Sequence, residues 1–535
     1  MSKPLSEQSS LLLRTSDSSS IENFYTDPEI LSAGIEKAHP DRWHIIPSLW
    51  CGAFLAALDS TVVAATYANM GSSLGDSSKA SWVATAYMLS SAALQPLYGG
   101  LSDIFGRKKA LMWANGLFLL GSLGCSMSQT MTQLVVARTV AGLGGAGLGT
   151  LSSIVVSDLV PLRERSTYNG FANLVYGCGQ VVGAPLGGYL ADTVGWRFAF
   201  WIQCPITLIS LLVIYTKVNI PIAQSMKISS LGEIDFFGSA ALIIAVVSLL
   251  IFSQSIGEVN SPDSSLILLI LLTMVFFVSF ITFVWIESTV INPIVPLNTL
   301  LSRNPLLSGL TNLFGYAGAF AVMFNVPLFL QIVVGETASM AGSRLISNVA
   351  GMCSGSLGAG FIIRRTQKFY AVLIVGVVLE IVGAIGISSL HKGQPDWVYQ
   401  LCTFPSGAGH GIVLSASLMA VISSVSKERQ ARATSISYLF RVCGGAFGVS
   451  MTASVNNFFL RQGLEYAFAG VPDKRTLILK IMSQVTYIDH LSPELKVAAV
   501  DVYNSVIHKS FYVTIGVHLL SACFALGIEE YPLNR

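Results

Sequence analysis

Apolar runs of about 20 residues recur through this chain from residue 46 onward. A helix of that length spans about 30 Å, which is the thickness of the hydrocarbon core of a bilayer. Only 11% of the residues are charged and 52% are hydrophobic, whereas about 25% of an ordinary soluble domain is charged. The runs therefore predict a protein that crosses a membrane many times. The composition argues against a soluble enzyme and against a disordered chain.

The number of apolar runs predicts an all-α polytopic membrane protein with 14 transmembrane helices. The runs lie at 46–68, 80–100, 110–128, 132–157, 168–190, 198–216, 234–254, 265–286, 306–333, 345–363, 370–390, 398–423, 433–455 and 510–528. Residues 457–509 carry mixed charge and are expected to form a long loop. The expected organisation is a cytosolic polar tail at 1–44, a six-helix half at 45–216, two inserted helices at 217–304 and a second six-helix half at 305–535.

The distribution of Lys and Arg predicts the orientation of these helices. If the N-terminus lies in the cytosol, the short cytosolic loops hold Arg107, Lys108, Lys109, Arg163, Arg165, Lys217, Lys227, Arg303, Arg364, Arg365, Lys368, Lys427, Arg429 and Arg432. The short loops on the other side hold only Lys79, Arg197, Arg344 and Lys392. This bias follows the positive-inside rule. Because the helix count is even, both termini are expected in the cytosol.

Charge, cysteine spacing and the lack of a nucleotide motif narrow the classes of function. The chain has 31 Lys and Arg and 29 Asp and Glu, so no nucleic-acid partner is expected. None of the eight cysteines forms a C-x-x-C pair, and we expect no metal and no cofactor. No phosphate-binding G-x-x-x-x-G-K-[ST] loop is present, which disfavours an ATP-driven pump. The chain is therefore expected to be a transporter and not an enzyme.

A glycine-rich helix end runs into a basic turn after the second apolar run. Its motif residues are Gly99, Leu101, Asp103, Gly106, Arg107 and Lys108. Residues 358–365 show a weaker form of the same pattern after the tenth run, which indicates two equivalent halves. The turn resembles the signature G-x-L-x-D-x-x-G-R-K/R of the major facilitator superfamily. That resemblance implies that these residues form a gate.

Further motifs resemble those of fourteen-helix drug:proton antiporters in this superfamily. They are residues 58–63 in the first run, 82–89 in the second, Leu134, Arg138 and Gly142 in the fourth, and 196–201 at the start of the sixth. The antiporter pattern G-x-x-x-G-P-x-x-G-G appears in the fifth run as Gly179, Gly183, Pro185, Gly187 and Gly188. Proline stands one residue later than in the pattern, so the helix kink it causes is expected to be displaced.

Residues 57–66 and the polar tail most resemble fungal vacuolar basic amino acid transporters. That resemblance implies exchange of protons for Lys, His or Arg across the vacuolar membrane. Glu7, Leu11 and Leu12 in the tail fit an acidic dileucine pattern that a sorting adaptor would bind. The alternative is a multidrug:proton antiporter of the plasma membrane. A receptor or scaffold fits less well because the gate motif would have no role.

Asp59 and Arg138 are ionisable residues at membrane depth, where such residues are costly and usually functional. The fold implied by the resemblance places their helices around a central cavity. The two side chains could therefore face one another or a ligand, or form a structural hydrogen bond. Asp59 could bind an ammonium group or a proton, and Arg138 could hold a carboxylate in a bidentate pair.

Glu380 and His410 are two further intramembrane candidates for binding protons or substrate. Glu380 lies in a run whose helix is expected to be peripheral, so it could simply pack against a neighbour. His410 could titrate near neutral pH or be a satisfied interior histidine. Arg441 is expected to anchor the cytosolic side. Weaker polar candidates for the cavity are Asn312, Tyr316, Asn325 and Tyr399.

Overall fold

The computed structural model describes most of the chain after the N-terminal tail. The described residues are 42–74, 81–218, 235–257, 262–290, 297–336, 338–471, 474–483, 487–488 and 491–533. These residues are all-α and contain no β-strand. The predicted all-α class is therefore confirmed. Within these described ranges, ten helical segments are long and apolar enough to cross a membrane by length and composition.

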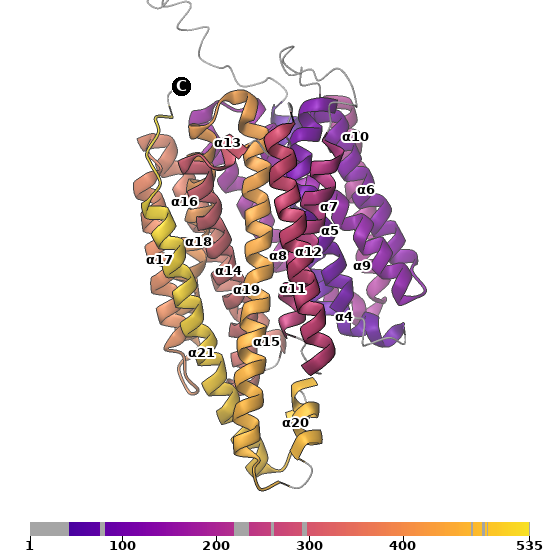
Figure 1. The fold of residues 1–535 in the computed structure, drawn as a ribbon, viewed down its shortest axis with the longest axis vertical. Helices are drawn as coiled ribbons and strands as arrows, with labels where there is room; N and C mark the ends of the chain where they lie inside the picture. The colour runs from indigo at the N-terminus through magenta and orange to yellow at the C-terminus, as the bar shows by residue number, and fades with distance from the viewer. Residues whose placement is uncertain are drawn as a thin grey trace, which may run out of the picture.

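Fourteen helices of fifteen residues or more run roughly side by side in the described part of the chain (Figure 1). They are α4 Arg42–Ser73, α5 Ser81–Phe105, α6 Arg107–Met127, α7 Met131–Leu159, α8 Leu162–Thr193, α10 Gln203–Lys217, α11 Phe236–Gly257, α12 Pro262–Thr289, α14 Arg303–Phe329, α16 Ile346–Thr366, α17 Tyr370–Ser388, α18 Asp396–Ser424, α19 Gln430–Ala467 and α21 Pro493–Leu526. Shorter elements are α9 Trp196–Trp201, α13 Leu297–Leu300, η4 Leu330–Val334, α15 Ala338–Arg344, η5 Lys427–Arg429 and α20 Lys474–Ser483.

The packing of the helices repeats between two halves of the bundle. In the first half α4 packs on α8, and α7 packs on α5 and α6. In the second half α14 packs on α19, and α18 packs on α16 and α17. The sets α4, α5, α6, α7, α8, α10 and α14, α16, α17, α18, α19, α21 therefore occupy corresponding places. The halves meet where α8 contacts α16 and α5 contacts α19.

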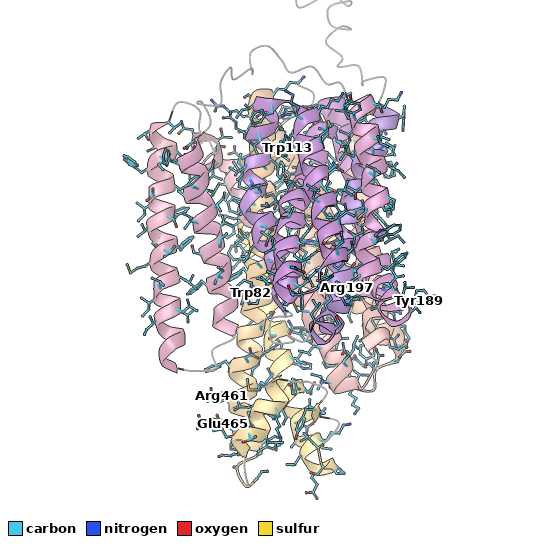
Figure 2. The ribbon with its side chains drawn as sticks, turned by 90° about the vertical axis from the view of Figure 1, so that its right-hand side faces the viewer. Trp82, Trp113, Tyr189, Arg197, Arg461 and Glu465 are labelled. Carbon is cyan, nitrogen blue, oxygen red and sulfur yellow. The ribbon has the colours of Figure 1, made fainter. Side chains whose placement is uncertain are left out.

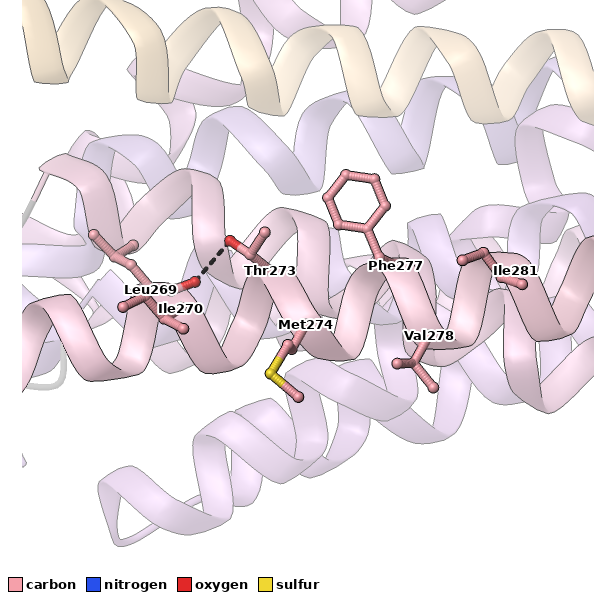
Figure 3. Close-up of a pocket in the computed structure, with 7 residues that line it drawn as sticks. All are labelled: Leu269, Ile270, Thr273, Met274, Phe277, Val278 and Ile281. Carbon is pink, nitrogen blue, oxygen red and sulfur yellow. Dashed lines mark hydrogen bonds between the residues drawn. The ribbon is translucent and has the colours of Figure 1, made fainter.

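Helices α11 and α12 lie at one side of the bundle (Figure 2). Helix α11 packs on α5, α12 and α19, whereas the apolar segment Ile267–Thr289 of α12 is only 6% buried. Figure 3 shows a shallow hollow on α12 in which Thr273 Oγ donates a hydrogen bond to the Leu269 carbonyl at 2.7 Å. All seven lining residues belong to α12 and none is charged. This hollow has the character of a lipid-facing surface and not of a transport site.

Exposed aromatic side chains lie near both ends of the bundle (Figure 2). Trp113 lies toward one end, and Trp82 and Tyr189 lie toward the other. Tryptophan and tyrosine are typical of the two interfaces between membrane and water. Their placement agrees with helices that cross a bilayer.

The expectation that 457–509 forms a loop is wrong for most of that segment. Helix α19 continues to Ala467, α20 follows, and α21 already begins at Pro493. Leu460, Leu464 and Phe468 form an apolar stripe that packs into a buried cluster with residues of α20 and α21. Figure 1 shows these helices extending beyond the rest of the bundle. The described part of this segment is thus mostly helical.

Candidate functional site

Glycines of α8 bring it against α4 beside Asp59. A side chain at Gly179 would clash with the Phe54 carbonyl at 2.5 Å, and one at Gly183 would clash with the Thr61 hydroxyl. Gly187 also faces α4, but Gly188 faces open space. The helix continues through Pro185 from Leu162 to Thr193. Three of the four motif glycines therefore fix the face of α4 that carries residues 58, 61 and 62, and Asp59 points elsewhere.

Asp59 faces Arg138 in a fully buried ion pair. Arg138 Nη1 lies 2.9 and 2.7 Å from the two carboxylate oxygens of Asp59. Gln203 of α10 donates from Nε2 to Asp59 Oδ1 at 3.4 Å. The side chains of Asp59 and Arg138 are 0% and 1% exposed. Of the arrangements that the sequence left open, the structure shows the one in which the two residues face each other.

Helix α5 holds the Arg138 guanidinium in place from a third side. Arg138 Nε donates to the Val83 carbonyl at 3.1 Å, and its guanidinium lies 4.4 Å from the centre of the Tyr87 ring. One turn further along α7, a side chain at Gly142 would clash with the Tyr87 carbonyl at 2.4 Å. Arg138 and Gly142, one turn apart on α7, therefore both face α5 at the same contact. Arg138 has little freedom to reach a ligand while this pair is intact.

A second buried cluster lies in the other half, where Glu380 is held between two histidines. His410 Nδ1 of α18 lies 3.2 Å from Glu380 Oε1, and His518 Nδ1 of α21 lies 3.3 Å from Glu380 Oε2. Glu380 is 0% exposed. Glu380 is therefore more than a peripheral packing residue, and His410 is its partner. Histidine is the side chain that ordinarily exchanges protons near physiological pH.

Helix α14 completes the second cluster. A side chain at Gly318 would clash with the His518 ring at 2.4 Å, so glycine is required for His518 to fit. Tyr316 of the same helix makes an edge contact with His410, with 4.8 Å between ring centres. The cluster is thus built by α14, α17, α18 and α21.

The two clusters draw on corresponding helices of the two halves. Arg138 and His410 lie on the corresponding helices α7 and α18, and Gln203 and His518 lie on α10 and α21. The carboxylates break the correspondence, because Asp59 comes from α4 and Glu380 from α17. Each half therefore contains one buried, titratable polar cluster within otherwise apolar helices.

The turn between α5 and α6 forms a compact ion network. Arg107 Nη1 donates to Asp103 Oδ1 at 2.6 Å, and its Nε donates to Asp158 Oδ2 of α7 at 2.7 Å. Gly106 has φ 91°, a conformation that favours glycine. The Lys108 ammonium lies 5.2 Å from the centre of the Tyr215 ring. The motif residues Asp103 and Arg107 therefore meet directly at this turn.

This end of the bundle, which we call the basic end, also holds contacts between the halves. A side chain at Gly99 would clash with Ser435 of α19 at 2.3 Å, and Asp103 lies 3.7 Å from Arg432 of the same helix. In the corresponding place, a side chain at Gly360 of α16 would meet the Ser166 carbonyl of α8 at 2.7 Å. The weak sequence repeat at 99–109 and 358–365 thus marks two equivalent contacts between halves.

Additional polar bonds join α8 to the second half near the basic end. Arg364 lies 3.0 Å from Glu164, and Arg165 Nη1 donates to Gln430 Oε1 at 2.9 Å. Asn173 Nδ2 donates to Ser356 Oγ at 2.8 Å. These bonds involve the first part of α8, which begins at Leu162. The structure is therefore closed at the basic end.

Arg441 does not anchor the basic end as expected. It lies eleven residues into α19, about 16 Å along the helix axis. Its guanidinium lies 4.7 Å from the centre of the Tyr438 ring and 6.0 Å from that of Tyr316. A side chain added at Gly149 of α7, in the other half, would lie 3.8 Å from the Tyr438 ring. Arg441 therefore belongs to a cluster where the halves face each other.

The remaining sequence candidates have other surroundings. Asn312 bonds to Ser417 of α18, and Asn325 bonds to Asn456 of α19, so both join helices. Tyr399 donates to the His391 carbonyl near the opposite end. Glu7, Leu11 and Leu12 lie outside the described residues.

Sequence reasoning missed Gln203 and His518. His518 stands in the last apolar run, and an ionisable residue at that depth was itself a signal. Gln203 follows the W-R-x-x-F-x motif by two residues, but an uncharged amide gives a weaker signal. Without the packing of the helices, Gln203 could not be assigned as a partner of Asp59, and His518 could not be assigned as a partner of Glu380.

Comparisons with known proteins agree with this architecture. The family model described as "Major Facilitator Superfamily" matches residues 49–449. The chain is 33% identical to the multidrug resistance protein fnx1 of Schizosaccharomyces pombe, over 95% of this chain and 96% of that protein. It is 34% identical to the vacuolar membrane amino acid uptake transporter fnx2 of the same organism, over 87% and 81%.

Two further similarities extend the comparison. The chain is 33% identical to vacuolar basic amino acid transporter 2 of Saccharomyces cerevisiae, over 82% of this chain and 94% of that protein. Among solved structures, the human organic anion transporter MFSD10 matches with a TM-score of 0.60 over 91% of this chain and 100% of that one. At 15% sequence identity this structure supports the fold alone.

Proposed function

Because this chain belongs to the Major Facilitator Superfamily, whose members named here are transporters and not enzymes, we propose that it exchanges protons for basic amino acids across the vacuolar membrane. The proposal includes fourteen membrane-spanning helices, with both termini and the basic end in the cytosol. The similarity to vacuolar transporters supports the proposed location of the protein in the vacuolar membrane. Delivery by an adaptor that binds Glu7, Leu11 and Leu12 is part of the same proposal.

The observation that carries the proposal is the buried pair of Asp59 and Arg138. Breaking a buried ion pair by removing one charge costs about 3–5 kcal/mol. Protonation of Asp59 neutralises the carboxylate and leaves Arg138 charged in the same dry position. The protonated and deprotonated states therefore differ strongly in how well α4 and α7 pack. Such a difference can couple a proton to the conformational change that transport requires.

The direction of exchange follows from which solution, lumen or cytosol, Asp59 is open to in each state of the cycle. When the site opens to an acidic lumen, protonation is favoured and a cationic ligand is released. When it opens to the near-neutral cytosol, the proton leaves and the ligand is favoured. Each pH unit contributes about 1.4 kcal/mol per proton, so one unit supports about tenfold accumulation per proton exchanged. Closure at the basic end corresponds to the lumen-facing part of this cycle.

The proposal is tested by uptake of labelled lysine into isolated vacuoles that contain or lack the protein. We expect uptake that depends on the protein and disappears when a proton uncoupler is added. The alternative function, multidrug:proton antiport at the plasma membrane, has support from the similarity to fnx1. It would be favoured if the protein moved organic cations across the cell surface and gave no lysine uptake.

The contacts of Asp103 lead to a prediction for the gate at the basic end. Asp103 bonds to Arg107 and lies near Arg432 of the other half, so it stabilises the state closed at this end. We expect Asp103→Asn to slow lysine transport while equilibrium binding stays within about tenfold, or about 1.4 kcal/mol. Initial rates and equilibrium binding are measured on the same preparation. Wild-type turnover in the variant would show that Asp103 has no gating role.

A further inference from the structure

Arg441 is a buried cation, and no carboxylate of the described residues lies within salt-bridge distance of its guanidinium. Its Nη2 donates to the Leu414 carbonyl at 3.1 Å, and its buried Nε has no hydrogen-bond partner in the part of the chain that the structure describes. By contrast Arg107, Arg138 and Arg344, which are also buried, have carboxylate oxygens at 2.6, 2.7 and 2.9 Å. Arg441 is 3% exposed, so water does not replace the missing anion.

A buried guanidinium without an anionic partner is costly at membrane depth. Charged groups inside membrane helices are tolerated when they pair with another group or with a ligand. The planar guanidinium presents several N–H donors and fits carboxylates well. Arg441 uses one of its donors on Leu414, and Nε remains available. An anionic group from outside the chain would complete its contacts.

The surroundings of Arg441 supply further polar groups for such an anion. Tyr438 and Tyr316 flank the guanidinium, and a side chain added at Gly149 of α7, in the other half, would lie 3.8 Å from the Tyr438 ring. Tyrosine hydroxyl groups can donate to a carboxylate.

We propose that Arg441 binds the carboxylate group of the transported molecule. This inference rests on the proposed function, because the amino acid supplies the carboxylate. It revises the earlier expectation for Arg138, whose guanidinium is already occupied by Asp59. Tyr316 contacts both Arg441 and His410. A ligand held by Arg441 is therefore adjacent to the cluster formed by Glu380 and its two histidines.

The test compares lysine with lysinamide, in which a neutral amide replaces the carboxylate. Full-length wild-type protein, Arg441→Gln and Arg441→Lys are reconstituted, and transport of both labelled compounds is measured. We expect wild type to prefer lysine. We expect Arg441→Gln to raise the KM for lysine at least about tenfold and to leave that for lysinamide within about twofold. The KM of Arg441→Lys for lysine should lie between those of the wild type and Arg441→Gln, because an ammonium keeps the charge but lacks the planar fork of a guanidinium.

Arg461→Gln is the matched control, because it makes the same substitution on the same helix at an exposed site paired with Glu465 (Figure 2). It should keep the wild-type preference. If Arg441→Gln transports neither compound, the test rests on Arg441→Lys. A ratio of the KM for lysinamide to the KM for lysine that is smaller in Arg441→Lys than in the wild type supports the inference. An unchanged preference in the active Arg441 variants would overturn this inference alone. A wild-type protein that transports neither compound would contradict both this inference and the proposed function.

Discussion

Asp59→Asn is expected to abolish proton-driven accumulation of lysine, so that the concentration ratio across the membrane falls to about one. Asparagine keeps the shape of the side chain but cannot be ionised, so it cannot exchange the proton. Its amide also leaves the Arg138 charge without the carboxylate that lies 2.7 Å away in the wild type. Accumulation at imposed pH differences, compared with equilibration without a gradient, measures the loss of coupling.

The unpaired Arg138 charge in this variant could itself lower stability, by about 3–5 kcal/mol for a buried pair. The double variant Asp59→Asn with Arg138→Gln removes both charges and should recover much of that stability. It should still fail to accumulate lysine. Asp501→Asn changes an exposed aspartate on α21 and serves as the control for the substitution. A normal gradient response in Asp59→Asn would show that Asp59 is structural.

Glu380→Gln is expected to flatten the pH profile of lysine uptake between pH 5 and 8. The carboxylate lies within 3.2 and 3.3 Å of His410 and His518, and can therefore stabilise a proton on either ring. The neutral amide of glutamine cannot stabilise that proton. A protonated histidine left without its carboxylate partner would then cost about 3–5 kcal/mol. Uptake at the acidic end of the profile should fall at least about tenfold. Initial rates over a series of pH values measure the effect.

The comparison for this prediction is His391→Gln. His391 lies in an exposed turn, so replacing it removes a titratable histidine without touching the buried cluster. Its pH profile should match that of the wild type. If Glu380→Gln keeps both the normal rate and the normal profile, the cluster holds helices together and exchanges no proton during transport.

Periodicity and charge were enough to predict much of the fold. The apolar runs predicted the positions of the long helices, because a membrane forces backbone hydrogen bonds to close within each helix. The segment 457–509 was the exception. Leu460, Leu464 and Phe468 show helical spacing there, but their mixed-charge neighbours look like a loop when only hydropathy is read. Once out of the membrane, a helix needs just one apolar stripe.

The individual site residues were predictable only in part. Asp59, Arg138, Glu380 and His410 were found because ionisable residues at membrane depth are rare. Which of them pair depends on contacts between helices far apart in the sequence, such as α17 with α21. For that reason His518 was missed as the second partner of Glu380. Arg441 was misplaced because its depth depends on where the helix begins, and α19 begins at Gln430, three residues before the predicted run.

The central claim is that the protein exchanges protons for basic amino acids, and reconstituted vesicles with an acidic interior test it most directly. Labelled lysine and a trapped pH indicator are followed together after the pH difference is imposed. The account predicts that lysine accumulates inside, by about tenfold per pH unit for each proton exchanged, while the interior becomes more alkaline. Accumulation that persists without the pH difference, or lysine entry that acidifies the interior, would contradict proton exchange.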